Sequence, residues 1–218
     1  MFIPIRHFPW AVSLLVAICV LSTGCTNNQI HATVQYENIF LDSSDLENYS
    51  LGFITPSTVT GQEQDIQSLA FIFARVLKRE RPDIRVVGLP ETLSAINQAD
   101  LADEYKQMYI DYRDTGIFKQ KLLKKVGRIT GVRYLAQLKL SSFSQHSKGR
   151  FGLLGLRLIQ TKEANIRLFL QIWDSETGAI AWEGTEELNY ARDTSIEKPV
   201  TFQLVVEEIA EDLVSKLP

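Results

Sequence analysis

The sequence is poor in cysteine and histidine, lacks a strong excess of either charge, and contains a single long apolar run. Its two cysteines cannot form the disulfide framework of a small secreted domain. A formal net charge of −3 argues against nucleic-acid binding, because domains that bind nucleic acid are usually clearly basic. Because the apolar run lies within the first two dozen residues, a polytopic membrane protein is excluded as well. What remains is 218 residues of ordinary globular composition, 45% of them hydrophobic.

The first 24 residues have the layout of a secretory signal. One cation, Arg6, precedes an apolar core from Trp10 to Leu21, and small residues follow. This core is too short to be a comfortable membrane span, and no acidic residue opposes an inside-positive orientation. We therefore predict that residues 1–24 are a signal peptide, removed from the mature chain.

Cys25 follows directly, in a run from Leu21 to Cys25 that resembles the lipobox of bacterial lipoproteins. Ser22 stands where Leu is usual, but Gly24 fits the pattern. The resemblance implies that the Cys25 thiol receives a diacylglycerol, that cleavage occurs before it and that the new amine is acylated. Two or three acyl chains, at about 0.8 kcal/mol per buried CH₂, give durable anchoring. Thr26, in place of the Asp that commonly retains such proteins at the inner membrane, implies outer-membrane attachment facing the periplasm.

Two other interpretations of this region stay open. One is a plain signal peptide that leaves Cys25 as a free thiol, and the other is an uncleaved anchor. Cys19 lies between apolar neighbours and belongs to the core of the signal. Without the signal, Cys25 is the one cysteine left, so an apolar core has to stabilise the fold without a disulfide.

The mature chain divides into a tether and one domain. Residues 26–33 are polar and lack periodicity, and we interpret 25–50 as a lipidated tether. The piece 34–41 is more apolar than a linker, and the sequence does not decide between a docking segment and an edge strand. The folded domain is predicted to span 51–218.

Hydrophobic periodicity predicts an α+β fold for this domain, a single mixed β-sheet with an antiparallel three-strand meander and helices packed on it. Glycines are expected to end two of the helices, at Gly116 and Gly131, and Gly178 is available for a positive φ in a turn. Along the chain the expected elements are a strand at 51–54, a helix at 63–80, a strand at 84–88, helices near 90–96, 105–112 and 118–129, strands at 134–140, 166–173 and 179–190, and a final helix from about residue 199.

Two short motifs accompany this order of elements. A helix leads into Gly131, Tyr134 and Leu135, and a strand ends in Asp174, Thr177 and Gly178. Order and motifs together resemble the periplasmic domain of the curli-secretion lipoprotein superfamily, which includes the outer-membrane lipoprotein activators of penicillin-binding proteins. The resemblance covers roughly residues 50–217. It implies a non-catalytic lipoprotein that binds protein partners or assembles into export channels.

A pore-forming hairpin is not expected here. Each of its two strands would need about 9–11 alternating residues that face lipid. In the candidate segment, 141–159, large apolar residues such as Leu156 and Leu158 lie on one side only, and the first part, 141–146, is polar.

Residues suited to catalysis or metal binding are few. His31 lies in the predicted tether and His146 in a predicted loop, so neither is placed to build a zinc site or a Ser-His-Asp relay. The segment 149–155 is rich in glycine but lacks the Gly-Lys-Ser/Thr of a phosphate loop, and we interpret it as a mobile loop. We therefore expect no enzymatic activity, no metal and no cofactor.

Two surfaces are candidates for contact with a partner. The first is a basic cluster, for which there are two explanations. The cations could lie near the C-terminus of their helix, where positive charge is favoured by the helix dipole. Alternatively, they could contact anionic lipid or an acidic partner. The second is an apolar segment, which is either the start of a strand or an exposed contact with a partner or a membrane. The basic cluster comprises Lys119, Lys121, Lys124, Lys125 and Arg128, and the apolar segment contains Phe151, Leu153, Leu154 and Leu156.

The sequence thus predicts a membrane-anchored periplasmic lipoprotein that binds an envelope protein as an adaptor or activator. The alternative is a structural or pore-forming subunit of an outer-membrane export assembly. An envelope hydrolase that uses Glu183, Glu186 and Glu187 is the least supported, because adjacent acids on a strand point to opposite faces. The partner's identity and any homo-oligomer are left undetermined.

Overall fold

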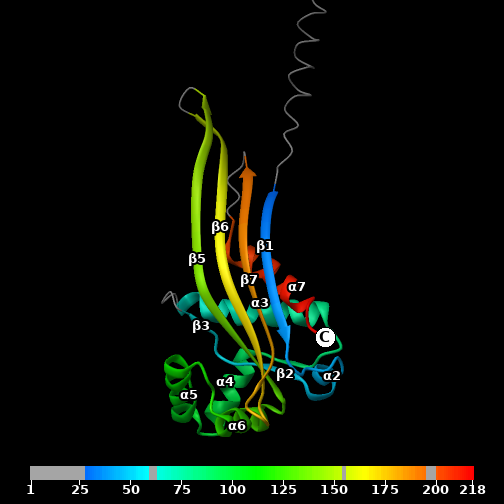
Figure 1. Ribbon diagram of the computed structural model, residues 1–218. Helices are drawn as coiled ribbons and strands as arrows, with labels where there is room; N and C mark the ends of the chain where they lie inside the picture. The colour runs from blue at the N-terminus through cyan, green and yellow to red at the C-terminus, as the bar shows by residue number, and fades with distance from the viewer. Residues whose placement is uncertain (1–27, 59–62, 154–155, 195–199) are drawn as a thin grey trace, which may run out of the picture.

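One mixed β-sheet organises the molecule (Figure 1). The computed structural model describes residues 28–58, 63–153, 156–194 and 200–218. The strand order is β1-β7-β6-β5-β2-β4, and β3 pairs with β5. Each of the neighbouring pairs β1–β7, β7–β6 and β6–β5 is antiparallel, whereas β2 and β3 run parallel to β5. The strands are β1 (Asn28–Asn38), β2 (Leu51–Phe53), β3 (Ser57–Thr58), β4 (Val86–Val87), β5 (Tyr134–Leu153), β6 (Leu156–Asp174) and β7 (Ile180–Thr194).

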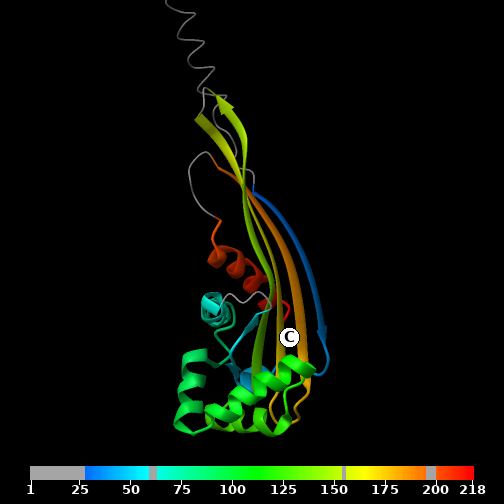
Figure 2. The same cartoon turned by 90° about the vertical axis from the view of Figure 1, so that its left-hand side faces the viewer.

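Helices lie on both faces of this sheet but cover them unequally. In the side view of Figure 2, α3 and α7 lie along one face of the long strands, and α4, α5 and α6 gather at the lower end. Within the described ranges, no helix has the length and apolar composition needed to cross a membrane. The helices are α2 (Asp45–Tyr49), α3 (Glu63–Glu80), α4 (Leu89–Gln98), α5 (Ala102–Thr115), α6 (Gln120–Thr130) and α7 (Phe202–Val214).

Strand alternation builds two apolar cores, one on each face of the sheet. On one face, Ile166 and Leu168 of β6 pack with the apolar residues of α3 and α7. On the other, Trp173 at the end of β6 packs with the residues of α5 and α6, and its ring meets that of Phe118 edge to face at 5.2 Å. The predicted α+β class, with its antiparallel meander and packed helices, is confirmed.

The turn chemistry expected from the sequence is present. Gly116 and Gly131 follow α5 and α6 with φ of 72° and 67°, the left-handed region that glycine enters at little cost. Gly178, in the turn between β6 and β7, has a φ of 75°, and a Cβ there would come within 2.7 Å of the Gln120 Cβ. This turn is therefore specified both by its backbone and by the close approach of α6.

The prediction of a tether that reaches residue 50 is wrong for 28–50. β1 pairs with β7 along its whole length, from Asn28 opposite Arg192 to Asn38 opposite Trp182, and it forms the edge of the sheet. Leu41, which follows β1, is buried in the core on the α3 and α7 side. For 34–41, the sequence left a docking segment and an edge strand as alternatives. Residues 34–38 form an edge strand.

The prediction of a mobile loop at 149–155 is also wrong for the described residues of that segment. β5 and β6 continue as a hairpin to the pair Leu153–Leu156, so they are 20 and 19 residues long. His146 therefore lies in a strand, opposite Glu163. The last pair between β3 and β5 is at Leu140, and a register shift between β5 and β6 follows directly after that residue. Small polar residues dominate this part of β5, so strand propensity in the sequence is weak there.

Candidate functional site

The upper part of one sheet face is open and polar. Above Trp173, β6 presents Gln171, Phe169 and Arg167 on the face opposite α3 and α7, and these side chains are partly or fully exposed. β1 and β7 contribute further polar side chains to this face. In the part of the chain that the structure describes, helices cover only the lower end of this face, so the upper part is the surface available to a partner (Figure 2).

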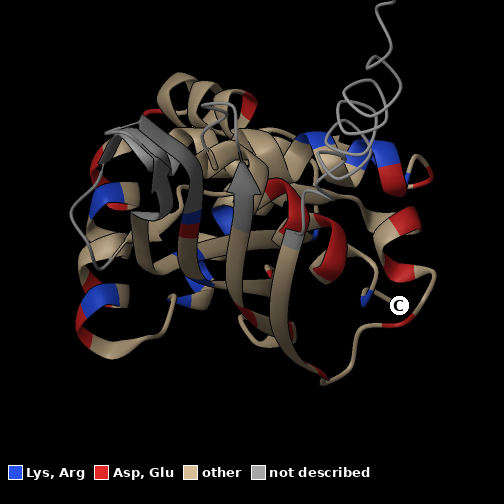
Figure 3. Ribbon diagram, turned by 90° about the horizontal axis from the view of Figure 1, so that it is seen from above, with Lys and Arg blue, Asp and Glu red and all other residues tan. Residues whose placement is uncertain are grey.

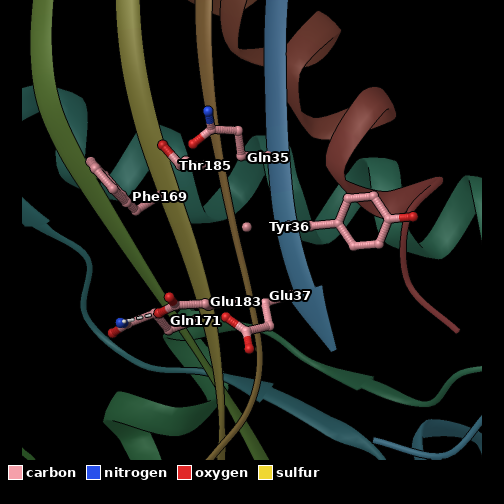
Figure 4. A pocket seen from close by; sticks show the side chains of 8 residues that line it. Gln35, Tyr36, Glu37, Phe169, Gln171, Glu183 and Thr185 are labelled. Atoms are coloured by element: carbon pink, nitrogen blue, oxygen red, sulfur yellow. Dashed lines mark hydrogen bonds between the residues drawn. The ribbon is translucent and has the colours of Figure 1, made fainter. Parts of the chain in front are cut away.

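A hollow of about 210 Å³ lies on this open face, across β1, β7 and β6 (Figure 4). Glu37 of β1 and Glu183 of β7 are direct register partners. Two like charges placed opposite each other disfavour strand pairing, so a cation or a hydrogen-bond donor bound between them would be stabilising. The side chains around these two acids come from Gln35, Phe169, Gln171 and Thr185.

A chain of hydrogen bonds connects this hollow to α5. The Tyr112 hydroxyl donates to Gln171 Oε1 over 3.3 Å, and Gln171 Nε2 donates to Glu183 Oε2 over 3.1 Å. Burial, and then the charge of Glu183, raises the pKa of Tyr112, so this hydroxyl stays a donor at neutral pH. The contacts orient the Glu183 carboxylate. The hollow was not predictable from the sequence, because Gln35 and Glu37 lie in the segment expected to be a tether.

The basic cluster is largely neutralised by acids of other elements. Lys119 Nζ lies 2.5 Å from Asp111 Oδ2, Lys125 Nζ lies 2.9 Å from Glu104 Oε1, and Lys124 pairs with Glu176. α6 begins at Gln120, so Lys119 and Lys121 lie at its N-terminal end, where the helix dipole disfavours cations. Only Arg128 lies in the last turn. The helix-dipole explanation is therefore wrong for Lys119 and Lys121.

Three residues of the predicted apolar segment lie at the end of the β5–β6 hairpin. The backbones of Phe151, Leu153 and Leu156 form the last rungs of the β5–β6 hairpin. Cys25 and Leu154 lie outside the described residues. Cys25 precedes the first residue of β1 by three positions.

The three acids considered for hydrolysis do not converge. Glu183 and Glu187 lie on the open face of β7, whereas Glu186 is fully buried on the opposite face, beneath α7. Among the described residues, no three His, Cys, Asp or Glu side chains are placed to hold a metal ion.

Glu186 is a buried carboxyl without a hydrogen-bond partner for either oxygen among the described residues. Burial, and then the charge of Asp212 on α7, raises its pKa to about 8. Glu208 acts in the same direction, and Lys216 opposes it. The carboxyl is therefore mostly protonated at neutral pH. Two other acids of α7, Glu207 and Glu211, pair with Arg75 and Arg79 of α3. Figure 3 marks the acidic and basic positions along the ribbon in red and blue.

The two sequence motifs meet at the lower end of the sheet and stabilise it. The buried Asp174 carboxylate accepts hydrogen bonds from Arg133 Nη2 at 2.8 Å and from the backbone N–H of Glu176 at 2.9 Å. The Arg133 guanidinium lies over the rings of Tyr49 and Tyr134, 5.0 and 5.4 Å from their centroids. These motif residues close the β6–β7 turn, and their contacts are those of a structural element.

Comparison with known proteins shows distant structural likeness only. No protein-family model and no curated protein matches the sequence. Similar solved structures include the PelC dodecamer from Paraburkholderia phytofirmans (TM-score 0.42, 14% identity, 86% of this chain and 95% of that chain). Others are lipoprotein GNA1162 from Neisseria meningitidis (0.39, 10%, 77% and 99%) and the C-terminal domain of LpoB from Escherichia coli (0.36, 13%, 63% and 81%). At these values the likenesses assign neither a family nor a function.

We expect the natural protein to lose stability at alkaline pH because the buried Glu186 carboxyl ionises there. The variant Glu186→Gln should prevent this loss. The pKa of about 8 in the folded state lies above the value in the unfolded state. The contribution of this carboxyl to the free energy of unfolding is therefore fully present below about pH 4 and is lost as the pH rises through 8. Glutamine cannot ionise. Urea unfolding at pH 5 and pH 8.5 should therefore show a smaller difference for the variant, with a higher midpoint than the natural protein at pH 8.5.

Glu187→Gln is the matched control, because Glu187 is exposed on the opposite face of the same strand. It should leave the pH dependence unchanged. Identical pH profiles for Glu186→Gln and the natural protein would contradict a buried, protonated Glu186.

Proposed function

We propose that this chain is a lipoprotein of the outer membrane that faces the periplasm and recruits a protein partner without catalysis. The anchor is assigned to Cys25 by the resemblance of residues 21–25 to a lipobox. β1 begins only three residues later, so the domain is held at the membrane surface. A short link suits a partner that is itself in or near the same membrane.

The observation that carries the adaptor role is the open edge of β1. β1 is an 11-residue strand without proline, and among the described strands only β7 pairs with it. Large apolar side chains are exposed on it and just after it: Ile30 is 41% exposed, Tyr36 56% and Ile39 50%. An unpaired strand edge with apolar side chains is a template for strand addition, in which the partner's backbone supplies the hydrogen bonds.

The acidic hollow beside this edge favours a partner with a positive charge. Glu37 projects from β1 itself and faces Glu183 on the next strand. A partner strand added to β1 would place its own side chains beside Glu37. A Lys or Arg at that position would relieve the repulsion between the two carboxylates, so we assign to the partner an extended segment that carries a basic residue.

A second candidate, a structural subunit that binds copies of itself in an export assembly, is favoured by one observation. Beyond Leu140, β5 has no strand on its outer side among the described residues. The four long strands therefore have an open edge on each side among the described residues, and one copy could pair with the next. The molecular mass in detergent separates the two candidates, since a monomer favours the adaptor and a large closed assembly favours the subunit.

Replacing the anchoring cysteine should release the protein from membranes. Cys25→Ala removes the thiol that is acylated, so after a salt wash most of the protein should move from the membrane to the soluble fraction. Cys19→Ala is the matched control, because Cys19 lies in the part removed with the signal, and it should leave the protein in membranes. A Cys25→Ala protein that still pellets with membranes at its normal mature mass would contradict the anchor.

Altering the open edge should abolish partner binding without unfolding the domain. We expect Ile30→Lys combined with Tyr36→Lys to remove the crosslinks that a photoreactive residue at position 33 forms in intact cells, because added cations oppose strand addition. Phe71→Lys is the control, since Phe71 is 64% exposed on α3, away from this edge. Unchanged crosslinks in the double variant would argue against recognition through β1.

A further inference from the structure

A basic depression of about 500 Å³ lies at the lower end of the sheet. Its walls come from the end of α2, the C-terminal end of α6, the start of β5 and the turn between β6 and β7 (Figure 1). Three arginines line it, Arg85, Arg128 and Arg133, and among its described lining residues Glu176 is the one acid. None of these lining residues belongs to β1, so the depression is a second surface, distinct from the acidic hollow.

Two of the three arginines carry a charge that no acid balances. Arg133 is paired with the buried Asp174, and the Glu176 carboxylate is paired with Lys124. By contrast, Arg85 and Arg128 form no ion pair with any described acid, and both are exposed. The depression therefore has an excess of about two positive charges, which favours an anionic ligand.

The two unbalanced arginines flank the end of α6. Arg85 Nη1 donates to the backbone oxygen of Gly131 over 3.0 Å, and Arg128 lies three residues before Gly131, on the same side of the helix. The bond to Gly131 uses one of the five N–H donors of Arg85. Within the described chain, the Arg128 guanidinium has no hydrogen-bond acceptor. Support of the helix end thus explains where Arg85 lies but leaves most of the donors of both guanidinium groups free for a ligand.

The chemistry of the walls favours a peptide with a carboxylate. A guanidinium group can hold a carboxylate through two parallel hydrogen bonds. Asn48, Ser50 and Ser175 also line the depression, and amides and hydroxyls both donate to and accept from peptide groups. The volume lies in the range of sites for ligands much larger than a single phosphate. A phosphate dianion would also meet the Glu176 carboxylate and the carbonyl groups that end α6.

We propose that this depression binds a short acidic peptide and holds one of its carboxylates between Arg85 and Arg128. This site goes beyond strand addition to β1 and does not depend on the lipid anchor. It flanks the last pair of β5 and β6, Tyr134 with Asp174, at the end of the sheet where β1 finishes. The ten residue steps of β1, at about 3.4 Å each, separate this end from the start of β1 by about 34 Å. If Cys25 is anchored, the site can therefore take a peptide presented away from the membrane.

The test measures peptide binding to the lipidated full-length mature protein in detergent micelles. The probe is the tetrapeptide Gly-Asp-Glu-Gly with a free C-terminus and a neutral fluorophore on its N-terminus, and the readout is fluorescence anisotropy. The matched probe is Gly-Asn-Gln-Gly amide, which has the same shape without carboxylates. We expect saturable binding of the acidic probe, weakened by added salt, and no binding of the amide probe.

The charge variants separate a built site from general attraction. Arg85→Gln combined with Arg128→Gln should weaken binding of the acidic probe about tenfold or more, because charge-assisted hydrogen bonds are lost. Lys78→Gln combined with Lys106→Gln is the matched control, since it removes the same net charge from exposed residues that do not line the depression. Equal weakening in both double variants, or unchanged binding in the arginine variant, would overturn the proposal.

A second variant keeps the test valid if loss of the Arg85 bond to α6 destabilises the domain. Arg128→Glu changes an exposed side chain that has no described partner, so its urea midpoint should match that of the natural protein within error, and binding of the acidic probe should be lost. Retained binding in this variant would contradict a carboxylate site at Arg128. Displacement of the probe by inorganic phosphate at a lower concentration than by the unlabelled peptide would assign the depression to phosphate and overturn the peptide ligand.

Discussion

The antiparallel pairing of β1 with β7 is the interaction on which the rest of this structure depends. It brings residues 28–38 into the sheet directly after Cys25, and so it removes the long tether that would let the domain reach away from a membrane. The same pairing makes β1 the open edge of the sheet and places Glu37 opposite Glu183. The proposed anchor, the edge for a partner strand and the acidic hollow beside it thus follow from one strand.

The two faces of the sheet have different roles. The face under α3 and α7 is a continuous apolar core, and its buried ionisable residue, Glu186, is accommodated as a neutral acid. Among the described residues, the opposite face is covered at its lower end, where α5 and α6 pack on Trp173 and α4 contributes Ile96, and the Arg133–Asp174 pair closes that end. Its upper part can stay polar and open because the first core already stabilises the strands. The lower end therefore contributes folding stability, and the upper end is available for recognition.

The sequence predicted the helices and the meander well because their signals are local. α3 shows a clear 3.6-residue stripe, and Gly131 and Gly178 mark a helix end and a turn that only glycine suits. β1 was missed because its open face carries Gln29, Thr33 and Gln35, which resemble a linker. Its partner, β7, lies about 150 residues away, and no local pattern reveals such a pairing. The ion pairs of the basic cluster and the burial of Glu186 depend on other elements in the same way.

Hydrogen exchange of the β1 backbone in the lipidated protein tests the central claim most directly. In an antiparallel edge strand every second amide donates to the neighbouring strand, so alternate amides of residues 28–38 should be protected to nearly the same degree as those of β7. The remaining β1 amides should exchange quickly in the absence of a partner. Rapid exchange of all amides from 28 to 38, at the rate of an unstructured chain, would show that this segment is a tether and would contradict the account.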